Sequence, residues 1–395
     1  MNTTTPEIEK NLCNKCRERL NLELTIHEVE NCDLCQNISQ HTDQITHLIQ
    51  NKINYFGIEF DSFVMACQIN NTQIKKKEKE IKELLNITDT KQDLKQEIKR
   101  EVGIKIAKTL SKTVEFENPE VVILVKIKEK PVENSQYPEI SNVNVFIDIN
   151  PIYIEGKYCK LERGIPQTKW PCTHCKGKGC VECNNTGQQY KYTVETLIAK
   201  HLLKQTNGKS TKFHGAGRED IDVRMLGEGR PFVIEVKHPF KRNIDLNQLQ
   251  KTVNTKSKGK ITIQDLKFVP KDRKAELKTS STNDYKIYSA IADFTKPVTD
   301  DDISKIKQLK EIKQRTPQRV AHRRADKIRT RNIRNIDVEK LSENQLKLII
   351  NCQGGLYIKE LISGDDERSH PSIAEITNNT CVCSQLDVIK VFHEN

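Results

Sequence analysis

The sequence predicts an α+β protein with at least two domains. Apolar residues recur at every fourth position from Leu94 to Leu110, which is typical of an amphipathic helix, and they alternate from Val143 to Ile149, which is typical of a strand. A second series of helices and strands follows after residue 189. Single cores usually stop growing near about 250 to 300 residues. The 395 residues of this chain therefore suffice for two or three cored domains.

The composition is that of a polar protein that can still bury cores, with 35% hydrophobic and 30% charged residues. Its longest apolar runs, such as residues 121–125, are too short to span a bilayer, so we expect no membrane insertion. The N-terminus has no apolar signal segment, which predicts a cytoplasmic location. In that compartment, thirteen cysteines favour thiolates bound to metal over disulfides.

Residues 1–40 carry Cys13-Asn-Lys-Cys16 and Cys32-Asp-Leu-Cys35. Two Cys-x-x-Cys pairs at this separation match a four-cysteine structural zinc site, and four reduced surface thiols are the plainer alternative. After them, residues 40–112 are lysine-rich and predicted to be broadly helical, and residues 121–127 and 143–154 are predicted to be strands. We assign residues 41–170 to one small domain.

A second cluster, Cys172-Thr-His-Cys175-Lys-Gly-Lys-Gly-Cys180-Val-Glu-Cys183, lies in a linker or knuckle that we place at residues 171–188. Its spacing predicts another structural zinc, giving one or two ions in all, with His174 as a bystander. The glycine spacing is also similar to a chaperone-type zinc repeat. Such repeats normally come in several copies after a J-domain, and neither is present in the sequence.

Residues 189–395 form the last predicted domain, with helices over residues 190–205 and 246–253 and strands over 231–236, 260–263, 285–292 and 345–351. Two acids, Asp220 and Asp222, stand between glycines just ahead of the first of these strands. A turn-forming role is the plain interpretation. A second interpretation is a metal-dependent nuclease using Asp222, Glu235 and Lys237.

Most of the excess positive charge lies between Lys305 and Arg334, where twelve Lys or Arg face two acids. A run this one-sided repels itself unless it binds an anion, which favours nucleic acid as the partner over a solvated helical face. We expect a helix from Lys305 that contacts phosphates without reading the sequence.

Four motifs decide between the interpretations. Gly217-Arg-Glu-Asp220 resembles the Gly-Arg-Thr-Asp motif of pseudouridine synthases, Tyr288-Ser-Ala290 resembles their Tyr-x-Ala strand, and residues 323–326 and 354–366 resemble two further segments. Together they are similar to the archaeal and eukaryotic tRNA pseudouridine synthase family that acts on positions 54 and 55 of the TΨC arm. Residues 153–170 resemble the end of that family's RNA-binding THUMP domain, which makes residues 41–170 the THUMP-containing RNA-binding domain. Together with the zinc region of residues 1–40, they would form a zinc-bearing THUMP-type α/β domain ahead of the catalytic domain.

The resemblance implies a pseudouridine synthase fold with a mixed, mainly antiparallel sheet in residues 189–395. It implies an isomerase that acts on tRNA without an organic cofactor, and no obligate protein partner is evident. Asp220 is then the catalytic carboxylate, Tyr288 stacks on the uracil, and Lys359 is the basic residue beside Asp220. Arg218, Arg323, Arg324 and Tyr357 are the expected substrate and RNA contacts. A non-catalytic zinc-containing RNA-binding protein is the remaining alternative.

Overall fold

A computed structural model describes residues 11–25, 29–131, 135–280 and 285–392 of the chain. The chain forms two compact units. The first unit comprises Met1–Pro151, Thr206–Lys209 and Lys237–Asn243, and the second comprises Ile152–Gln205, Ser210–Val236 and Ile244–Asn395. Within the described residues, no helix combines the length and the apolar character that a membrane crossing requires.

The first unit contains a four-stranded sheet in the order β2-β1-β3-β4. Its strands are β1 (Ser62–Asn70), β2 (Thr113–Val114), β3 (Val121–Lys128) and β4 (Val143–Ile149). Its helices are α2 (Asn14–Arg19), α3 (Thr42–Phe56), α4 (Thr72–Leu84), α5 (Leu94–Leu110) and the 3₁₀ helix η1 (Pro138–Ile140). β1 pairs in parallel with β2 and β3, whereas β3 and β4 are antiparallel.

Helix α5 begins where the sequence predicts, because Asp93 and Gln96 form a capping box that satisfies backbone N–H groups of the first turn. Its stripe of apolar residues packs in the core of the first unit. The prediction that residues 40–112 are broadly helical is wrong at β1. This strand buries Phe63 and Met65 on one face, between two parallel neighbours. Its pairing with β3 is non-local, and the local sequence carries little sign of it.

The second unit contains a ten-stranded sheet, in which β6 pairs with β7 and the others follow the order β13-β10-β11-β12-β9-β14-β7-β5-β8. Its strands are β5 (Ile152–Lys160), β6 (Ser210–Gly215), β7 (Arg224–Lys237), β8 (Ile261–Phe268), β9 (Tyr285–Phe294), β10 (Glu311–Arg315), β11 (Ile328–Ser342), β12 (Gln345–Gln353), β13 (Ser369–His370) and β14 (Cys381–Phe392). Its helices are α6 (Val194–Thr206), α7 (Leu246–Lys256), α8 (Arg273–Ser280), α9 (Asp300–Lys307), α10 (Ile358–Ser363) and α11 (Ile373–Ile376), with 3₁₀ helices η2 (Val181–Cys183) and η3 (Gln318–Arg323). The predicted α+β class with a mixed, mainly antiparallel sheet is confirmed.

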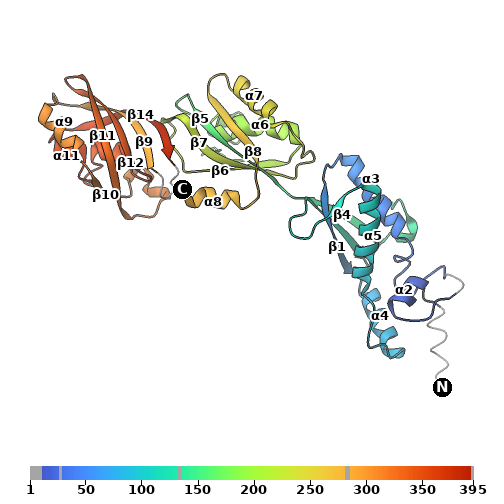
Figure 1. Cartoon of the computed structure of the whole chain (residues 1–395). Coiled ribbons are helices and arrows are strands. Elements are labelled where there is room, and N and C mark those ends of the chain that lie inside the picture. Colours follow the sequence, from blue (N-terminus) through green and yellow to red (C-terminus); the bar gives the residue numbers. More distant parts are fainter. Residues whose placement is uncertain (1–10, 26–28, 132–134, 281–284, 393–395) are drawn as a thin grey trace. The chain divides into compact units, whose positions relative to one another are not determined.

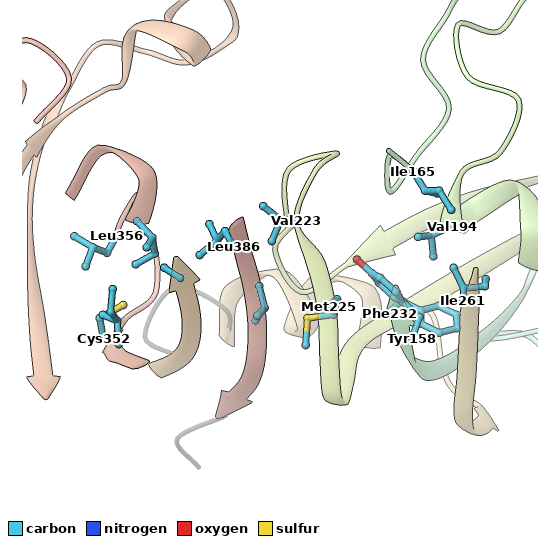
Figure 2. Packing of buried hydrophobic residues seen from close by; sticks show 14 of the residues in the cluster. Tyr158, Ile165, Val194, Val223, Met225, Phe232, Ile261, Cys352, Leu356 and Leu386 are labelled. Carbon is cyan, nitrogen blue, oxygen red and sulfur yellow. The ribbon is translucent and has the colours of Figure 1, made fainter. Parts of the chain in front are cut away.

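This large sheet has two halves (Figure 1): β5 to β8 with α6 and α7, in green to yellow, and β9 to β14, in orange to red. The halves meet where β7 and β14 pair in parallel over two residue pairs, Arg224 with Asp387 and Met225 with Val388. Arg224 reinforces this seam by donating from Nε and Nη2 to the two oxygens of Asp387, at 3.0 and 2.7 Å. The buried apolar core is continuous across it, and Figure 2 shows Val223 and Leu386 near the seam.

The strand predicted over residues 143–154 is two strands, because Pro151 follows Asn150 and interrupts the pairing. The second of them, β5, lies in the large sheet between β7 and β8. The unit that holds this sheet thus begins at Ile152, whereas the sequence analysis placed residues up to 170 with the preceding domain.

The basic segment 305–334 is not the helix that the sequence analysis expected. Only its first residues belong to α9, and the rest runs through β10, η3 and the start of β11. In β10, the buried residues Ile312 and Gln314 alternate with exposed Lys313 and Arg315. Part of the segment therefore belongs to the sheet, and in β10 the strand alternation places the charged side chains on the exposed face.

Candidate active site

A cavity of about 570 Å³ lies in the second unit, where segments far apart in the sequence meet. Its walls come from the loop between β6 and β7, from β9, from the basic segment, from the turn before α10 and from β14. Six of the residues predicted as site residues line it: Arg218, Asp220, Tyr288, Arg324, Tyr357 and Lys359. The side chain of the seventh, Arg323, lies outside the described residues.

Asp220 is presented to this cavity with its side chain 30% exposed. Its Oδ2 accepts a hydrogen bond from Arg319 Nη1 at 2.7 Å. Arg319 also donates from Nε and Nη2 to the two oxygens of Glu360, at 2.5 and 3.3 Å. Burial opposes the charge on Arg319, but Glu360 and Asp220 outweigh it and raise the pKa of the guanidinium. Arg319 is therefore a fixed cation beside Asp220.

Lys359 has a different partner from the one predicted. Its Nζ donates to Asp222 Oδ2 at 2.6 Å, while Arg319 takes the place beside Asp220. Burial alone would raise the pKa of the Asp222 carboxyl, but the hydrogen bond and charge of Lys359 hold it below its ordinary value. The two acids, two residues apart, thus have separate basic partners, and of the two Asp220 lines the cavity.

Glu219 lies between Arg218 and Asp220 in the loop, and its side chain points inward. Its side chain is 1% exposed and forms an ion pair with Arg230 on β7, whose Nε donates to Oε2 at 2.8 Å. The hydroxyl of Tyr158 donates to the same carboxylate at 2.9 Å, and Lys160 Nζ lies 3.8 Å from Oε1. A buried acid is thus surrounded by donors from β5 and β7.

The same buried cluster also fixes the backbone of the loop. Arg230 Nη1 donates to Ala216 O at 2.8 Å, and Gln167 Nε2 donates to Gly217 O at 2.9 Å. Lys160 Nζ donates to Asp220 O at 2.9 Å. The backbone carbonyls before and after the Arg218-Glu219 dipeptide therefore accept hydrogen bonds from side chains of the same cluster that surrounds Glu219. We call Tyr158, Lys160, Gln167, Glu219 and Arg230 the loop framework.

Gly217 is required by this arrangement. It adopts φ +77°, and a Cβ there would lie 3.1 Å from Arg230 Nη1. An L-residue would therefore be strained in its backbone and would also crowd the arginine that holds the loop.

Tyr288 lies on β9, opposite Val388 on β14 and Ile350 on β12. It is half-buried in the cavity wall, and burial raises the pKa of its phenol, so the ring is neutral near pH 7. A neutral aromatic ring on a central strand provides a rigid stacking surface.

Tyr357 is positioned by Gln314, a buried residue of β10 that the sequence analysis did not single out. Gln314 Oε1 accepts from Tyr357 N and its Nε2 donates to Tyr357 O, both at 2.9 Å. This two-sided contact anchors Tyr357, which precedes α10, and α10 carries Lys359. Gln314 reaches Tyr357 from β10, which pairs with β11.

The two cysteine clusters have the geometry of closed four-thiolate sites. In each cluster the Sγ atoms lie within 4.8 Å of one another. Sγ–Sγ distances of 3.6 to 3.9 Å are recorded in the two clusters, and a tetrahedron with metal–sulfur bonds of about 2.3 Å has edges of about 3.8 Å. In the first, Arg19 Nη2 donates to Cys16 Sγ at 3.4 Å. In the second, backbone N–H groups of Gly179 and Gly187 donate to Sγ atoms of the cluster at 3.1 and 3.2 Å. Such donors suit thiolates, so both clusters could hold a metal ion.

The nuclease alternative finds no such support. Glu235 Oε2 lies 3.2 Å from Lys274 Nζ and 3.3 Å from His214 Nε2, so its carboxylate is already paired in a buried cluster. Within the residues that the structure describes, the groups able to hold a metal are the two cysteine clusters and a His174-Cys180-Glu182 set beside the second. Asp222 and Glu235 belong to none of them.

Comparison with protein families identifies the chain. The family model described as "Pus10, C-terminal" matches residues 153–392, which include the whole cavity, and "Pus10 THUMP domain, archaeal" matches residues 49–126. The chain belongs to the Pus10 family. The resemblance to a tRNA pseudouridine synthase family with a THUMP domain is thereby confirmed.

Relatives in the Pus10 family are similar over nearly the whole chain. The "tRNA pseudouridine synthase Pus10" of Methanosphaera stadtmanae is 58% identical, covering 96% of this chain and 95% of the relative. The protein of the same name from Methanothermobacter marburgensis is 41% identical over 95% of this chain and 89% of its own length. A solved structure, "Crystal Structure of a Cbf5-Nop10-Gar1 Complex", covers 60% of this chain and 50% of the matched chain at 17% identity, with a TM-score of 0.33.

Proposed function

We propose that this member of the Pus10 family is a tRNA pseudouridine synthase that converts uridine to pseudouridine at positions 54 and 55 of the TΨC arm. The proposal rests mainly on one observation: Asp220 and Tyr288 line the same cavity, whose lining is rich in cationic side chains. The names of the relatives support the activity. The positions rest on the motif resemblance.

In this reaction the bond from ribose C1′ to uracil N1 breaks, the uracil turns, and C1′ bonds to C5. The proton leaves C5 and N1 gains one, so atoms balance and no redox cofactor is needed. Asp220 acts as the nucleophile or base. Arg319 orients it, and Tyr288 stacks on the loose uracil. Lys359, paired with Asp222, contributes a second cation at the site.

The target nucleotide must leave its stack to reach Asp220, which is a flipping step. Arg218, adjacent to the catalytic residue in the loop, fills the gap that the flipped base leaves. Tyr357, with Arg319 at 5.9 Å from its ring centroid, completes the entrance. Arg323 and Arg324 with the remaining basic segment contact the RNA backbone, and the THUMP domain provides further contact.

The basic segment gives a measurable salt dependence. Replacing Arg323 and Arg324 by Ala should lower the slope of log affinity against log salt by up to about two, because each lost phosphate contact removes about 0.9 from the slope. Filter binding of TΨC-arm RNA across a salt series measures it. Replacing two exposed lysines of α7, Lys251 and Lys256, which lie outside the THUMP domain, the basic segment and the cavity lining, is the charge-matched control. A slope equal to that of the control would show that this segment is only a solvated surface.

We also propose that both cysteine clusters bind structural zinc. Four thiolates leave no open position for catalysis, so the metal stabilises the fold. The purified protein should contain two zinc ions per chain. Cys172→Ser should lose one of them and lower the melting temperature, whereas Cys67→Ser, outside both clusters, should keep both. Metal analysis with thermal unfolding tests this, and fewer than one zinc per chain would contradict it.

Tritium release from C5-labelled TΨC-arm RNA, measured with and without EDTA, separates the candidate functions. We expect release that resists EDTA. Magnesium-dependent cleavage would support a nuclease, and binding without release would support an RNA-binding protein without activity. A cytoplasmic location and action without an obligate protein partner belong to this proposal.

A further inference from the structure

The lining of the cavity carries far more positive charge than its proposed target base requires. Eight lining side chains are basic and two are acidic, which leaves a net formal charge of +6. Uracil is uncharged at neutral pH, whereas each phosphodiester of RNA carries one negative charge. The excess therefore points to the backbone that flanks the base.

Part of this positive charge is already neutralised by protein carboxylates. Arg230 pairs with Glu219, Lys359 pairs with Asp222, and Arg319 pairs with both Asp220 and Glu360. These three cations hold the loop and its acids in place. They are not available to a substrate anion without breaking a pair.

Three other lining arginines differ from these paired cations. Within the described residues, Arg324, Arg329 and Arg331 have no carboxylate in ion-pair contact. The side chains of Arg329 and Arg331 donate hydrogen bonds to uncharged oxygen atoms. Arg329 Nη1 donates to Thr316 Oγ1 at 3.1 Å, and Arg331 Nη1 donates to Thr330 O at 2.8 Å. By contrast, Arg315 in the same segment pairs with Asp326 at 2.6 Å.

The fold presents two of these arginines together. Arg329 and Arg331 are two residues apart on β11, so their side chains leave the same face of the strand, toward the cavity. Arg331 lies against Gly355, where φ is +90° and a Cβ would approach Arg331 Nε to 3.1 Å. That Nε is buried without a recorded hydrogen-bond partner in the described structure. Gly355 thus makes room for a guanidinium whose hydrogen-bonding capacity is only partly used.

From this we infer that Arg324, Arg329 and Arg331 form a binding site for the phosphodiester groups on either side of the target uridine. The inference rests on the proposed function, and it goes beyond general RNA binding because it assigns one wall of the cavity to particular linkages. Guanidinium groups suit this role, since they donate two parallel hydrogen bonds to phosphate oxygens. The site would favour a uridine within a chain over free uridine.

A double-substitution experiment tests the assignment: it measures whether replacing an arginine and neutralising one phosphate of the RNA have non-additive effects on affinity. The full chain, with Asp220→Asn to prevent turnover, is titrated with a TΨC-arm hairpin RNA. Two matched RNAs each carry one neutral methylphosphonate linkage next to the target uridine, one RNA on the 5′ side and the other on the 3′ side. In both, the ribose adjoining the modified linkage carries a 2′-O-methyl group. The control RNA carries that 2′-O-methyl group with a normal phosphate.

Arg324→Gln and Arg331→Gln should each weaken binding of the control RNA about tenfold, the effect of one charge-assisted contact. At least one of them should change binding of a methylphosphonate RNA by less than about twofold, because the contact is already absent. Arg331→Lys keeps the charge but not the two parallel hydrogen bonds, so it should weaken binding less than Arg331→Gln does. Lys313→Gln removes one charge from an exposed site of β10 outside the cavity lining, and it should weaken all RNAs equally.

Equal losses on control and methylphosphonate RNAs for both arginine variants would overturn the site, as would an absence of RNA binding by the full chain. Arg324 is exposed, so its variant reports on the site even if Arg331→Gln disturbs the turn at Gly355. Failure of the proposed function appears separately, as an absence of pseudouridine in RNA treated with the wild-type chain. Charge coupling in that case would keep the phosphate site and reject the isomerase.

Discussion

Asp220→Asn is expected to abolish pseudouridine formation, with the single-turnover rate falling by about 10,000-fold or more. The amide keeps the shape of the side chain but can serve neither as nucleophile nor as base. RNA affinity should stay nearly unchanged, because the cations assigned to RNA binding lie elsewhere in the cavity lining and in the basic segment. Rapid-quench detection of pseudouridine, with a parallel binding titration, measures both quantities.

Asp222→Asn is the matched control for this change. It lies two residues further along the same loop and has its own basic partner, Lys359. We expect a reduced but measurable rate, because this carboxylate orients a cation and does not react. Full activity in the Asp220 variant would reject the assignment. Loss of all activity with Asp222→Asn alone would move the catalytic role by two residues.

Glu219→Gln is expected to lower both stability and rate, because the buried carboxylate of Glu219 accepts hydrogen bonds from Arg230 and Tyr158. The change leaves Arg230 and Lys160 buried at 2% and 0% side-chain exposure without their carboxylate. Removing one partner of a buried ion pair costs about 3 to 5 kcal/mol. The released loop should also misplace Asp220, and a displacement of about 1 Å can slow a reaction about 100-fold. Urea unfolding and single-turnover rates measure the two effects.

A double variant separates charge from positioning. Glu219→Gln with Arg230→Gln removes both charges, so it should recover part of the stability but not the rate, because the bond from Arg230 to Ala216 O is also lost. Glu339→Gln breaks an exposed pair with Lys347 and should change stability by less than about 1 kcal/mol. If Glu219→Gln behaves like this surface control, the loop framework does not position Asp220.

Features of the structure that depend on neighbouring residues were predicted from local patterns in the sequence. The apolar stripe from Leu94 to Leu110 is α5, and the alternating residues from Val143 are β4. Both predictions rest on periodicities that an isolated segment already has. The cysteine spacings likewise placed four thiols within reach of one ion in each cluster, because each pair is separated by only two residues.

Contacts between distant segments could not be predicted in this way. The acid partners of Arg319 and Lys359 depend on how the basic segment and α10 reach a loop that lies 99 and 137 residues earlier in the sequence. In the sequence, Arg319 is one of twelve basic residues in a segment that was expected to be a helix. Glu219 is part of the Gly217-Arg-Glu-Asp220 motif, but its inward orientation depends on an ion pair with Arg230, which lies on β7.

The short parallel seam between β7 and β14 also bears on how the protein folds. Asp220 comes from one half of the large sheet, and Tyr288 and Lys359 come from the other. The two halves join through residues 163 positions apart, Arg224 and Asp387. Closing a loop of that length is entropically unfavourable and slow compared with forming hairpins such as β11–β12. Recovery of enzymatic activity during refolding should therefore lag behind the return of secondary structure, because each half can acquire its strands before Asp220 and Asp222 meet Arg319 and Lys359.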